Sequence, residues 1–316
     1  MAAITDINII LRYLTNPATD LTTNIYMITR KKENNDFFYN IFTAETHDDI
    51  AIQLNNIFTD HLKHIFEKNK DFREYDIDDS TNEYLQYIPQ SSVSAANDIF
   101  TKIINNDADP FAINTEMFNN LWTYAVKIEL DDNNKVVWFR KYNKSMVFKK
   151  GNLDAMFFKD GKFSKIEHDV FKVDNKVDCF IWNDEIYISQ HNNFEKIFSY
   201  EDQYEAKSSE ALQMIKETFS YIDHDSLKIY VEKDSSQKRK LAAILKNGVY
   251  GKYGFNEVTA TIEKYGLDIE VNTNEQKLNL TPKDSRRFLK ILNDDYLRSE
   301  VTKIRYESIA KRKGQR

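Results

Sequence analysis

Residues 154–205 constrain the fold of this chain more than any other stretch, because apolar and polar side chains alternate there in short runs. A period of two is typical of half-buried strands, and Asp-Gly or Asn-Asp between such runs is typical of a tight turn. The stretch therefore predicts an antiparallel meander that leads into a helix. The apolar runs are Met156/Phe158, Val177/Cys179/Ile181 and Ile186/Ile188, and the turns lie at Lys159–Lys162 and Asn183–Asp184.

The N-terminal third predicts an α+β arrangement of its own. We expect a helix over Ile4–Leu14, a hairpin from NIYMITR and DFFYNIF with its turn at Glu33–Asn35, and a long helix over Asp48–Lys68. The long helix carries apolar residues at helical spacing, so one of its faces must pack, and we expect it to cover the hairpin. A strand (YLQYI) and a helix around Ala95–Ile104 follow, and the composition then turns polar and acidic. We place a domain boundary there, with an N-terminal α+β domain over 1–110 and a second α+β domain over 111–316.

The second part predicts a segregated antiparallel sheet with helices packed on it, which makes the fold class α+β. A helical stretch over Phe194–Tyr221, broken near Tyr200, follows the meander. A later helix has a strong start signal, with Thr281 as N-cap, Pro282 at the first helical position and Asp284 in the first turn. The expected strands are Thr123–Leu130, Lys135–Phe148, Ala155–Phe158, Asp178–Trp182 and Glu185–Ser189.

Composition excludes several classes of protein. The chain of 316 residues has 7 glycines and 4 prolines, which argues against a Gly-rich cofactor loop and against Pro-rich linkers. The single cysteine, Cys179, lies in a strand alternation and is expected to be buried. The N-terminus resembles an amphipathic helix, not a signal peptide, and no apolar run approaches the length of a membrane span. We therefore expect a cytoplasmic protein that reaches a membrane only through a partner.

Charge is segregated along the chain, although the net charge is only −6. Residues 71–109 contain nine acids and two bases, whereas residues 133–153 contain six bases and no acid. Residues 283–316 contain eleven bases and five acids. An acidic region and two basic regions thus coexist, and a third basic cluster opens the helix SSQKRKLAAILKNG, where bases oppose the helix dipole.

Basic segments with interleaved aromatic residues are typical of surfaces that hold phosphate backbones. In VVWFRKYNKSMVFKK, Trp138, Phe139, Tyr142 and Phe148 alternate with bases, so one face of a strand would present cations together with a stacking ring. The alternative is that these rings face the core and the lysines are merely solvated. For the third cluster the alternative is a neighbouring carboxylate, and for the C-terminal bases it is a frayed tail. The candidate DNA-binding residues are Arg140, Lys141, Lys144, Lys149, Lys150, Lys238, Arg239, Lys240, Lys311, Arg312 and Lys313.

No catalytic, cofactor or metal motif is evident. The chain lacks GxxxxGK[ST], HExxH and paired CxxC sequences, and His61 and His64 are expected to be a solvated pair. A metal-dependent nuclease would need carboxylates and often a lysine at strand ends. Asp178, Asp184 and Glu185 lie in a strand-turn-strand context, but Ile186 and Tyr187 stand where that lysine is expected. We therefore expect no cofactor and no metal, and favour a protein that is not an enzyme, with a nuclease as the alternative.

The order of elements resembles a known family. A strand, the turn KDGKF, the strand pair in VFKVDNKVDCFIWNDEIYIS and the helix NNFEKIFSYEDQYEAKSSEAL are similar to the core of the Kiwa protein B (KwaB-like) family of bacterial anti-phage defence. Near the C-terminus, LNDDYLRSEVTKIRYESIAKR resembles the end of the same domain. The similarity extends from about Trp122 to Lys311, none of these motifs is catalytic, and residues 1–120 give no match of their own.

The resemblance implies a two-component defence system in which an integral membrane protein, KwaA, senses infection and recruits this component, which binds invading DNA. The first hypothesis is a non-catalytic homodimer that binds double-stranded DNA without sequence preference and is peripheral to the inner membrane through KwaA. The second is a Mg²⁺-dependent nuclease that uses Asp178, Asp184 and Glu185. The third is an interaction adaptor that docks through its acidic residues 71–109.

Overall fold

The computed structural model divides the chain into two compact units, which are described separately. Unit 1 comprises Met1–Tyr75 and Thr81–Ser199, and unit 2 comprises Asp76–Ser80 and Tyr200–Arg316. The structure describes residues 2–16, 21–34, 36–44, 46–67, 72–77, 85–111, 117, 120–148, 156–159, 161–233, 235–247 and 253–308.

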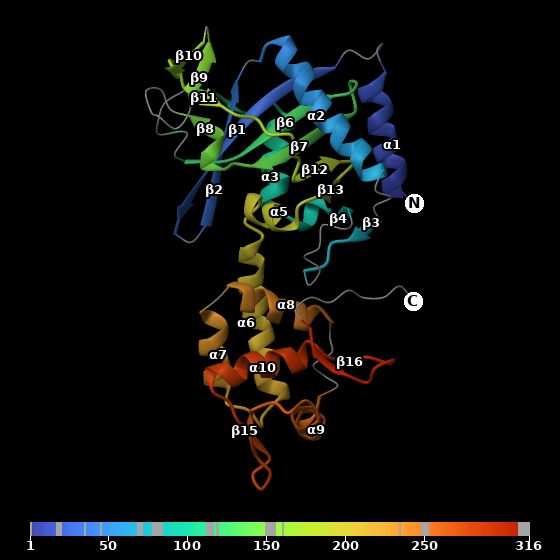
Figure 1. The fold of residues 1–316 in the computed structure, drawn as a ribbon, viewed down its shortest axis with the longest axis vertical. Helices are drawn as coiled ribbons and strands as arrows, with labels where there is room; N and C mark the ends of the chain where they lie inside the picture. Colours follow the sequence, from blue (N-terminus) through green and yellow to red (C-terminus); the bar gives the residue numbers. More distant parts are fainter. Residues whose placement is uncertain are drawn as a thin grey trace. The chain divides into compact units, whose positions relative to one another are not determined.

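Unit 1 is built on a nine-stranded sheet with the order β3-β4-β13-β12-β7-β6-β1-β2-β5 (Figure 1). Its pairs are antiparallel except for β2–β5 and β3–β4, which are parallel. The strands are β1 (Thr22–Glu33), β2 (Asp36–Ala44), β3 (Phe72–Glu74), β4 (Leu85–Pro89), β5 (Asp109–Pro110), β6 (Leu121–Glu129), β7 (Lys135–Lys141), β12 (Cys179–Trp182) and β13 (Glu185–Ile188).

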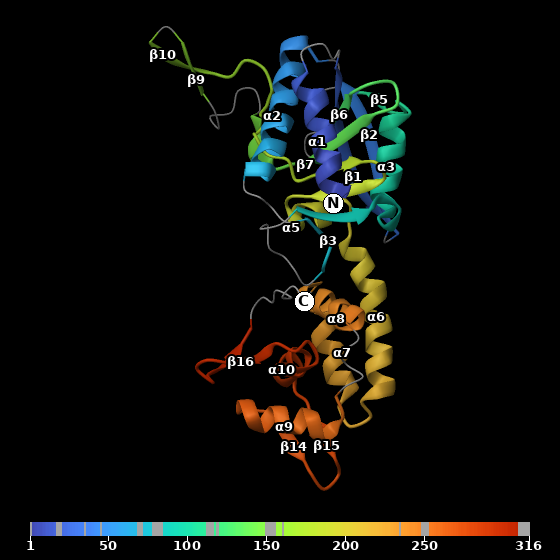
Figure 2. The same ribbon diagram turned by 90° about the vertical axis from the view of Figure 1, so that its right-hand side faces the viewer.

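Helices cover both faces of this sheet. On one face lie α1 (Ala2–Thr15) and α2 (Asp48–Glu67), and on the other lies α3 (Ser94–Ile104) (Figure 2). The apolar stripe of α2 packs on the sheet through Phe58, whose ring lies 5.3 Å from that of Phe180 and 6.4 Å from that of Trp138. All three side chains are fully buried, so this contact is the centre of the core. The short helix α5 (His191–Ile197) follows β13.

Two small two-stranded sheets complete unit 1. One pairs β8 (Val147–Phe148) with β11 (Val170–Phe171), and the other pairs β9 (Met156–Lys159) with β10 (Lys162–Lys165). Two short 3₁₀ helices, η1 (Gln90–Ser92) and η2 (Lys144–Met146), lie in the connections. The strand expected over residues 135–148 therefore ends earlier, at Lys141, because the chain turns into η2, which the Asn143 side chain caps.

Unit 2 is mostly helical, and its helices surround an apolar cluster that includes Phe219, Leu241, Phe288 and Leu292. The helix α10 begins as expected, since Thr281 and Asp284 form a reciprocal capping box and Pro282 occupies the first turn. The helices are α6 (Glu201–Thr218), α7 (His224–Glu232), α8 (Ser235–Asn247), α9 (Phe255–Tyr265) and α10 (Pro282–Leu292). The strands are β14 (Glu270–Asn272), β15 (Lys277–Asn279), β16 (Tyr296–Arg298) and β17 (Arg305–Glu307).

The α+β fold class is confirmed, as are the N-terminal hairpin, the long helix and the meander strands β12 and β13. The helical break near Tyr200 is also present, because α5 ends at Ile197, and Ser199 has a positive φ of 50°. The boundary expected near residue 110 does not coincide with the division of the structure, which falls after Ser199. Strands from both sides of residue 110 pair in one sheet, and hydrogen bonds between β1 and β6 join them directly.

Candidate nucleic-acid interface

Arg140, at the end of β7, is engaged by two carboxylates inside unit 1. Its Nε and Nη2 donate to the two carboxylate oxygens of Asp174 at 2.9 and 2.6 Å, and its Nη1 donates to Asp178 Oδ1 at 2.8 Å. Burial lowers the pKa of Arg140, but the hydrogen bonds and charges of Asp174 and Asp178 raise it further, so the net shift is upward. Arg140 is therefore a permanent cation whose charge is balanced by its neighbours.

Asp178 is fully buried and holds this end of the sheet together. Besides Arg140, its carboxylate accepts hydrogen bonds from the Lys141 backbone N–H at 2.6 Å and from Asn193 Nδ2 at 2.9 Å. A buried carboxylate is stable only when donors and a counter-charge surround it. Asp178, which lies just before β12, is thus joined to β7 through Arg140 and Lys141, and to α5 through Asn193.

Lys141 lies beside a tryptophan that the sequence did not single out. Its Nζ donates to the backbone oxygen of Trp122 at 2.7 Å and lies 3.5 Å from the centroid of the Trp122 ring. The guanidinium carbon of Arg30 lies 3.2 Å from the centroid of the same ring. Trp122 Nε1 donates to the backbone oxygen of Lys196 at 3.0 Å, which ties the ring to α5, and the positive charge of Lys196 acts on Lys141. We call Arg30, Trp122, Lys141 and Lys196 the Trp122 cluster.

The sheet positions this cluster. Arg30, Trp122 and Lys141 come from the three adjacent strands β1, β6 and β7, and Lys196 comes from the last turn of α5. Arg30, Trp122 and Lys141 are half-buried, whereas Lys196 is exposed. Cations over an indole ring gain from the negative face of its π system, more so where water is partly excluded. The cluster therefore presents cations and an aromatic side chain together at the surface of unit 1.

Electrostatic repulsion is built into the Trp122 cluster. Burial, together with the positive charges of Arg30 and Lys196, lowers the pKa of Lys141 to about 8, and the attraction of Asp178 only partly opposes this shift. Like charges that share a site disfavour the protonated form of a lysine, and a bound anion would reverse that effect. The site is therefore suited to an anion.

The remaining candidate cations are dispersed. Lys144 is exposed in η2, whereas Lys149, Lys150, Lys311, Arg312 and Lys313 lie outside the described residues. On α8, in unit 2, Arg239 Nε donates to the backbone oxygen of Ile77 at 2.8 Å, and Lys240 Nζ pairs with Asp295 at 2.6 Å. Lys238 is half-buried on the same helix. The carboxylate of Asp295 thus balances the charge of Lys240. For Lys240, this is the alternative to a bound anion that the sequence left open.

Two of the four rings that the sequence interleaves with bases are in the core. Trp138 and Phe139 are both fully buried, on opposite faces of β7, and Trp138 packs against Phe58 and Tyr124. The expectation that this strand presents a stacking ring of its own is wrong for these two residues, because both faces of the sheet are covered. Trp122, Arg30 and Lys196 were missed, since no sequence spacing connects residues that only the sheet brings together.

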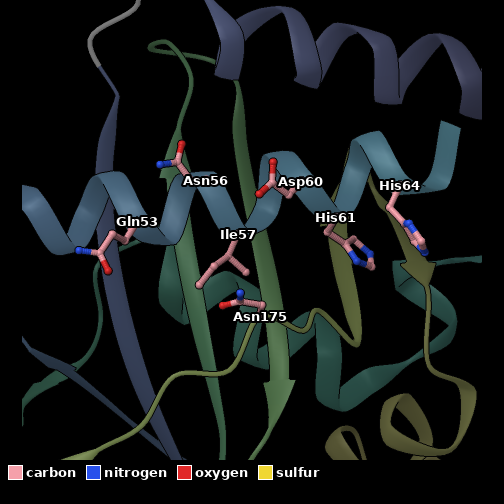
Figure 3. A pocket seen from close by; sticks show the side chains of 7 residues that line it. All are labelled: Gln53, Asn56, Ile57, Asp60, His61, His64 and Asn175. Atoms are coloured by element: carbon pink, nitrogen blue, oxygen red, sulfur yellow. The ribbon is translucent and has the colours of Figure 1, made fainter. Parts of the chain in front are cut away.

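A polar hollow of about 400 Å³ lies beside α2 (Figure 3). All of its lining residues except Asn175 come from α2, and His61 Nε2 lies 2.8 Å from Ser189 Oγ. Within the described part of the chain, no group of three or more His, Cys, Asp or Glu side chains is placed to hold a metal ion. Asp178, one of the three candidate nuclease carboxylates, is committed to Arg140. The hollow is lined by Gln53, Asn56, Ile57, Asp60, His61, His64 and Asn175.

Comparison with known proteins identifies the family. Residues 118–302 match the model of the family described as Kiwa protein KwaB-like, which is more than half of the chain. The chain belongs to this family. The KwaB-like region contains the whole sequence of β6, β7, β12 and β13, and it includes Trp122, Lys141 and Lys196, while Arg30 precedes it.

A curated relative agrees with this assignment. The Kiwa protein KwaB of Escherichia coli O55:H7 (strain RM12579 / EPEC) is 29% identical over 157 residues, which are 48% of this chain and 50% of the relative. The chain thus spans about half the length of that relative. No solved structure matches the chain. Among the helices that the structure describes, none is long and apolar enough to cross a bilayer.

Proposed function

We propose that this KwaB-like chain is the DNA-binding component of a Kiwa anti-phage defence system. It holds double-stranded DNA by contacts to phosphates, without sequence preference and without cleaving it. A membrane partner of the KwaA type recruits it from the cytoplasm, and it acts as a homodimer. The observation that carries the DNA-binding proposal is the Trp122 cluster, in which the side chains of Arg30 and Lys141 lie against one partly exposed indole and the positive charge of Lys196 acts on Lys141.

Phosphate is the anion that this site fits best. Arg30 offers a planar guanidinium and Lys141 and Lys196 offer point charges, the two kinds of group that bind phosphate backbones. Each neutralised phosphate releases condensed counterions, which gives affinity that does not depend on sequence. Three phosphate contacts correspond to a slope of about −2.7 in log affinity against log salt concentration. The Trp122 ring has no set of hydrogen-bond donors that could distinguish one base from another. This agrees with DNA binding that does not depend on sequence.

The direct test reverses a charge at the site. Lys196→Glu changes an exposed lysine of the Trp122 cluster, and Lys63→Glu makes the same change at an exposed position of α2 in the same unit. Fluorescence anisotropy with duplexes of unrelated sequence should show at least about tenfold weaker binding for Lys196→Glu, because one attraction becomes a repulsion. Lys63→Glu should bind within about twofold of the unchanged chain.

The same samples separate binding from cleavage. Incubation of labelled duplex with Mg²⁺ or Mn²⁺ should leave the DNA intact at protein concentrations that saturate it. Loss of affinity in both variants alike would show that overall charge, and not the Trp122 cluster, holds the DNA. Cleaved product that disappears in Asp184→Asn would replace the proposal with the nuclease alternative.

A further inference from the structure

The hairpin of β9 and β10 is open to solvent on both of its faces. The strand β10 comprises Lys162–Lys165, and all four of its side chains are exposed, although side chains alternate between the two faces of a strand. Within the described part of the chain, no third strand pairs with this hairpin, and Figure 2 shows it extending away from the nine-stranded sheet. An isolated two-stranded ribbon is only marginally stable in water. The ribbon therefore gains stability from any partner that covers it.

One face of this ribbon carries large apolar side chains. Lys165 lies opposite Met156 in the register, so Met156 shares a face with Lys165 and with Phe163, two residues before Lys165. Met156 is 53% exposed and Phe163 is 69% exposed. Exposed apolar side chains that gather on one element mark a contact surface. We call the face with Met156, Phe163 and Lys165 the Phe163 face.

The bases of this ribbon are available to an anion. Among the described residues, no carboxylate pairs with Lys162 or Lys165, and both side chains are exposed. The sequence of residues 156–165 contains three lysines and one acid. Lys165 lies on the Phe163 face itself, so positive charge and apolar surface occur together there. A partner that complements this face is anionic and also accepts an apolar side chain.

Duplex DNA meets both requirements. Proteins that bind the minor groove insert Phe, Met and other apolar side chains between base pairs as wedges, while basic residues hold the groove. Two-stranded ribbons are among the elements that enter a groove. The minor groove shows nearly the same pattern for several base pairs, which agrees with binding that does not depend on sequence. An acidic protein partner fits less well, because stable protein interfaces engage about 20–30 residues on each side, and β9 and β10 have only four residues each.

We propose that the β9–β10 ribbon lies in the minor groove of the duplex and that Phe163 inserts between two base pairs as a wedge, which bends the DNA. The Phe163 face lies against the floor of the groove, and Lys165 binds a phosphate beside the wedge. Lys162, on the other face, adds positive charge at the edge of the groove. This inference rests on the proposed DNA binding, and it adds a contact that changes the shape of the DNA to the phosphate contacts of the Trp122 cluster.

Energy transfer between dyes at the two ends of a duplex of about 30 base pairs tests the wedge. The full chain is used at concentrations that saturate the DNA, so that a change of affinity does not affect the result. Wedges of this kind kink DNA by about 20–90°, so the unchanged chain should increase the energy transfer. Phe163→Ala should bind the duplex but lose this increase. Phe163→Leu should retain most of it, because leucine also serves as a wedge.

The matched control is Phe38→Ala, which makes the same change at another exposed phenylalanine of unit 1. Phe38 is 51% exposed on the hairpin of β1 and β2, whose end carries the opposed acids Glu33 and Asp36. Acidic side chains repel phosphates, so this hairpin end should not enter a groove. Phe38→Ala should therefore bend the duplex as the unchanged chain does. Circular dichroism melts establish that all three variants are folded.

The possible results separate the wedge from the proposed function. A saturated duplex that stays straight with the unchanged chain, or equal bending by the unchanged chain and Phe163→Ala, would overturn the wedge and leave DNA binding intact. Absence of duplex binding by the unchanged chain would overturn both. A dimer that dissociates in Phe163→Ala but not in Phe38→Ala, measured by sedimentation velocity without DNA, would assign the Phe163 face to a second copy of the chain.

Discussion

The proposed DNA binding by this KwaB-like chain should weaken as pH rises through about 8, because Lys141 would hold phosphate in its protonated form. In the free chain the pKa of Lys141 is lowered to about 8. At about pH 7 the ammonium is present in most molecules, and at about pH 9 roughly nine-tenths of them have lost it. A phosphate beside the amine raises its pKa again, so binding at high pH takes up a proton.

The magnitude follows from linkage. If the pKa in the complex is at least about 10, the affinity falls by about tenfold between about pH 7 and pH 9, equivalent to about 1.4 kcal/mol. The affinity must fall, and not rise, with increasing pH. The reason is that Lys141 has the lower pKa in the free chain, so the free chain loses this proton at a lower pH than the complex does.

The assay is anisotropy of a labelled duplex across this pH range at constant ionic strength, with Lys141→Arg as the matched variant. Arginine keeps its charge throughout, so the variant should show little of the pH dependence. The difference between the two curves isolates residue 141 from every other titrating group. Identical curves for lysine and arginine, or an affinity that rises with pH, would refute the reasoning about this site.

Three further predictions concern stability in urea. Arg140→Met leaves Asp178 buried without its counter-charge, so the free energy of unfolding should fall by about 3–5 kcal/mol, and a change below about 1 kcal/mol would contradict the account of the ion pair. Phe58→Ala removes the ring that packs between Trp138 and Phe180, so the free energy of unfolding should fall by about 3–5 kcal/mol. The control is Ile52→Ala on the exposed face of α2, and a loss of the same size in that variant would contradict the burial pattern. Thr281→Ala removes the cap of α10 and should lower the stability of unit 2 by about 1 kcal/mol, whereas Thr281→Ser should be close to neutral.

Elements governed by local sequence were predictable. Alternation and turn residues indicated β12 and β13, and Asn183 and Asp184 between them both adopt positive φ, as a tight hairpin turn requires. The start of α10 followed from Thr281 and Pro282. These signals lie within a few residues of each other, so no knowledge of tertiary contacts was needed.

Features that depend on pairing between distant strands were not predictable. The chain turns polar near residue 110, but β6 pairs with β1 across that point, and the N-terminal strands join one sheet with the later ones. The sequence interleaves Lys141 with rings of its own segment, among them Trp138, but Trp138 is in the core and the ring beside Lys141 is that of Trp122. Trp122 and Arg30 reach Lys141 only because β1, β6 and β7 are neighbours.

Charge counts along a sequence also do not show which cations are balanced. Arg140 and Lys240 contribute to basic segments, yet each pairs with a carboxylate from another element, Arg140 with Asp178 and Lys240 with Asp295. Such pairs form only in the folded chain. At Lys141 the positive charges of Arg30 and of Lys196 each act more strongly than the negative charge of Asp178.

The most direct test of the central claim is the salt dependence of duplex affinity for the unchanged chain and for Arg30→Gln/Lys196→Gln. Between about 50 and 200 mM salt, the affinity of the unchanged chain should fall about fortyfold if three phosphates are contacted, and the slope of the double variant should be shallower by about two contacts. A slope near zero, or the same slope in both proteins, would contradict phosphate binding at the Trp122 cluster.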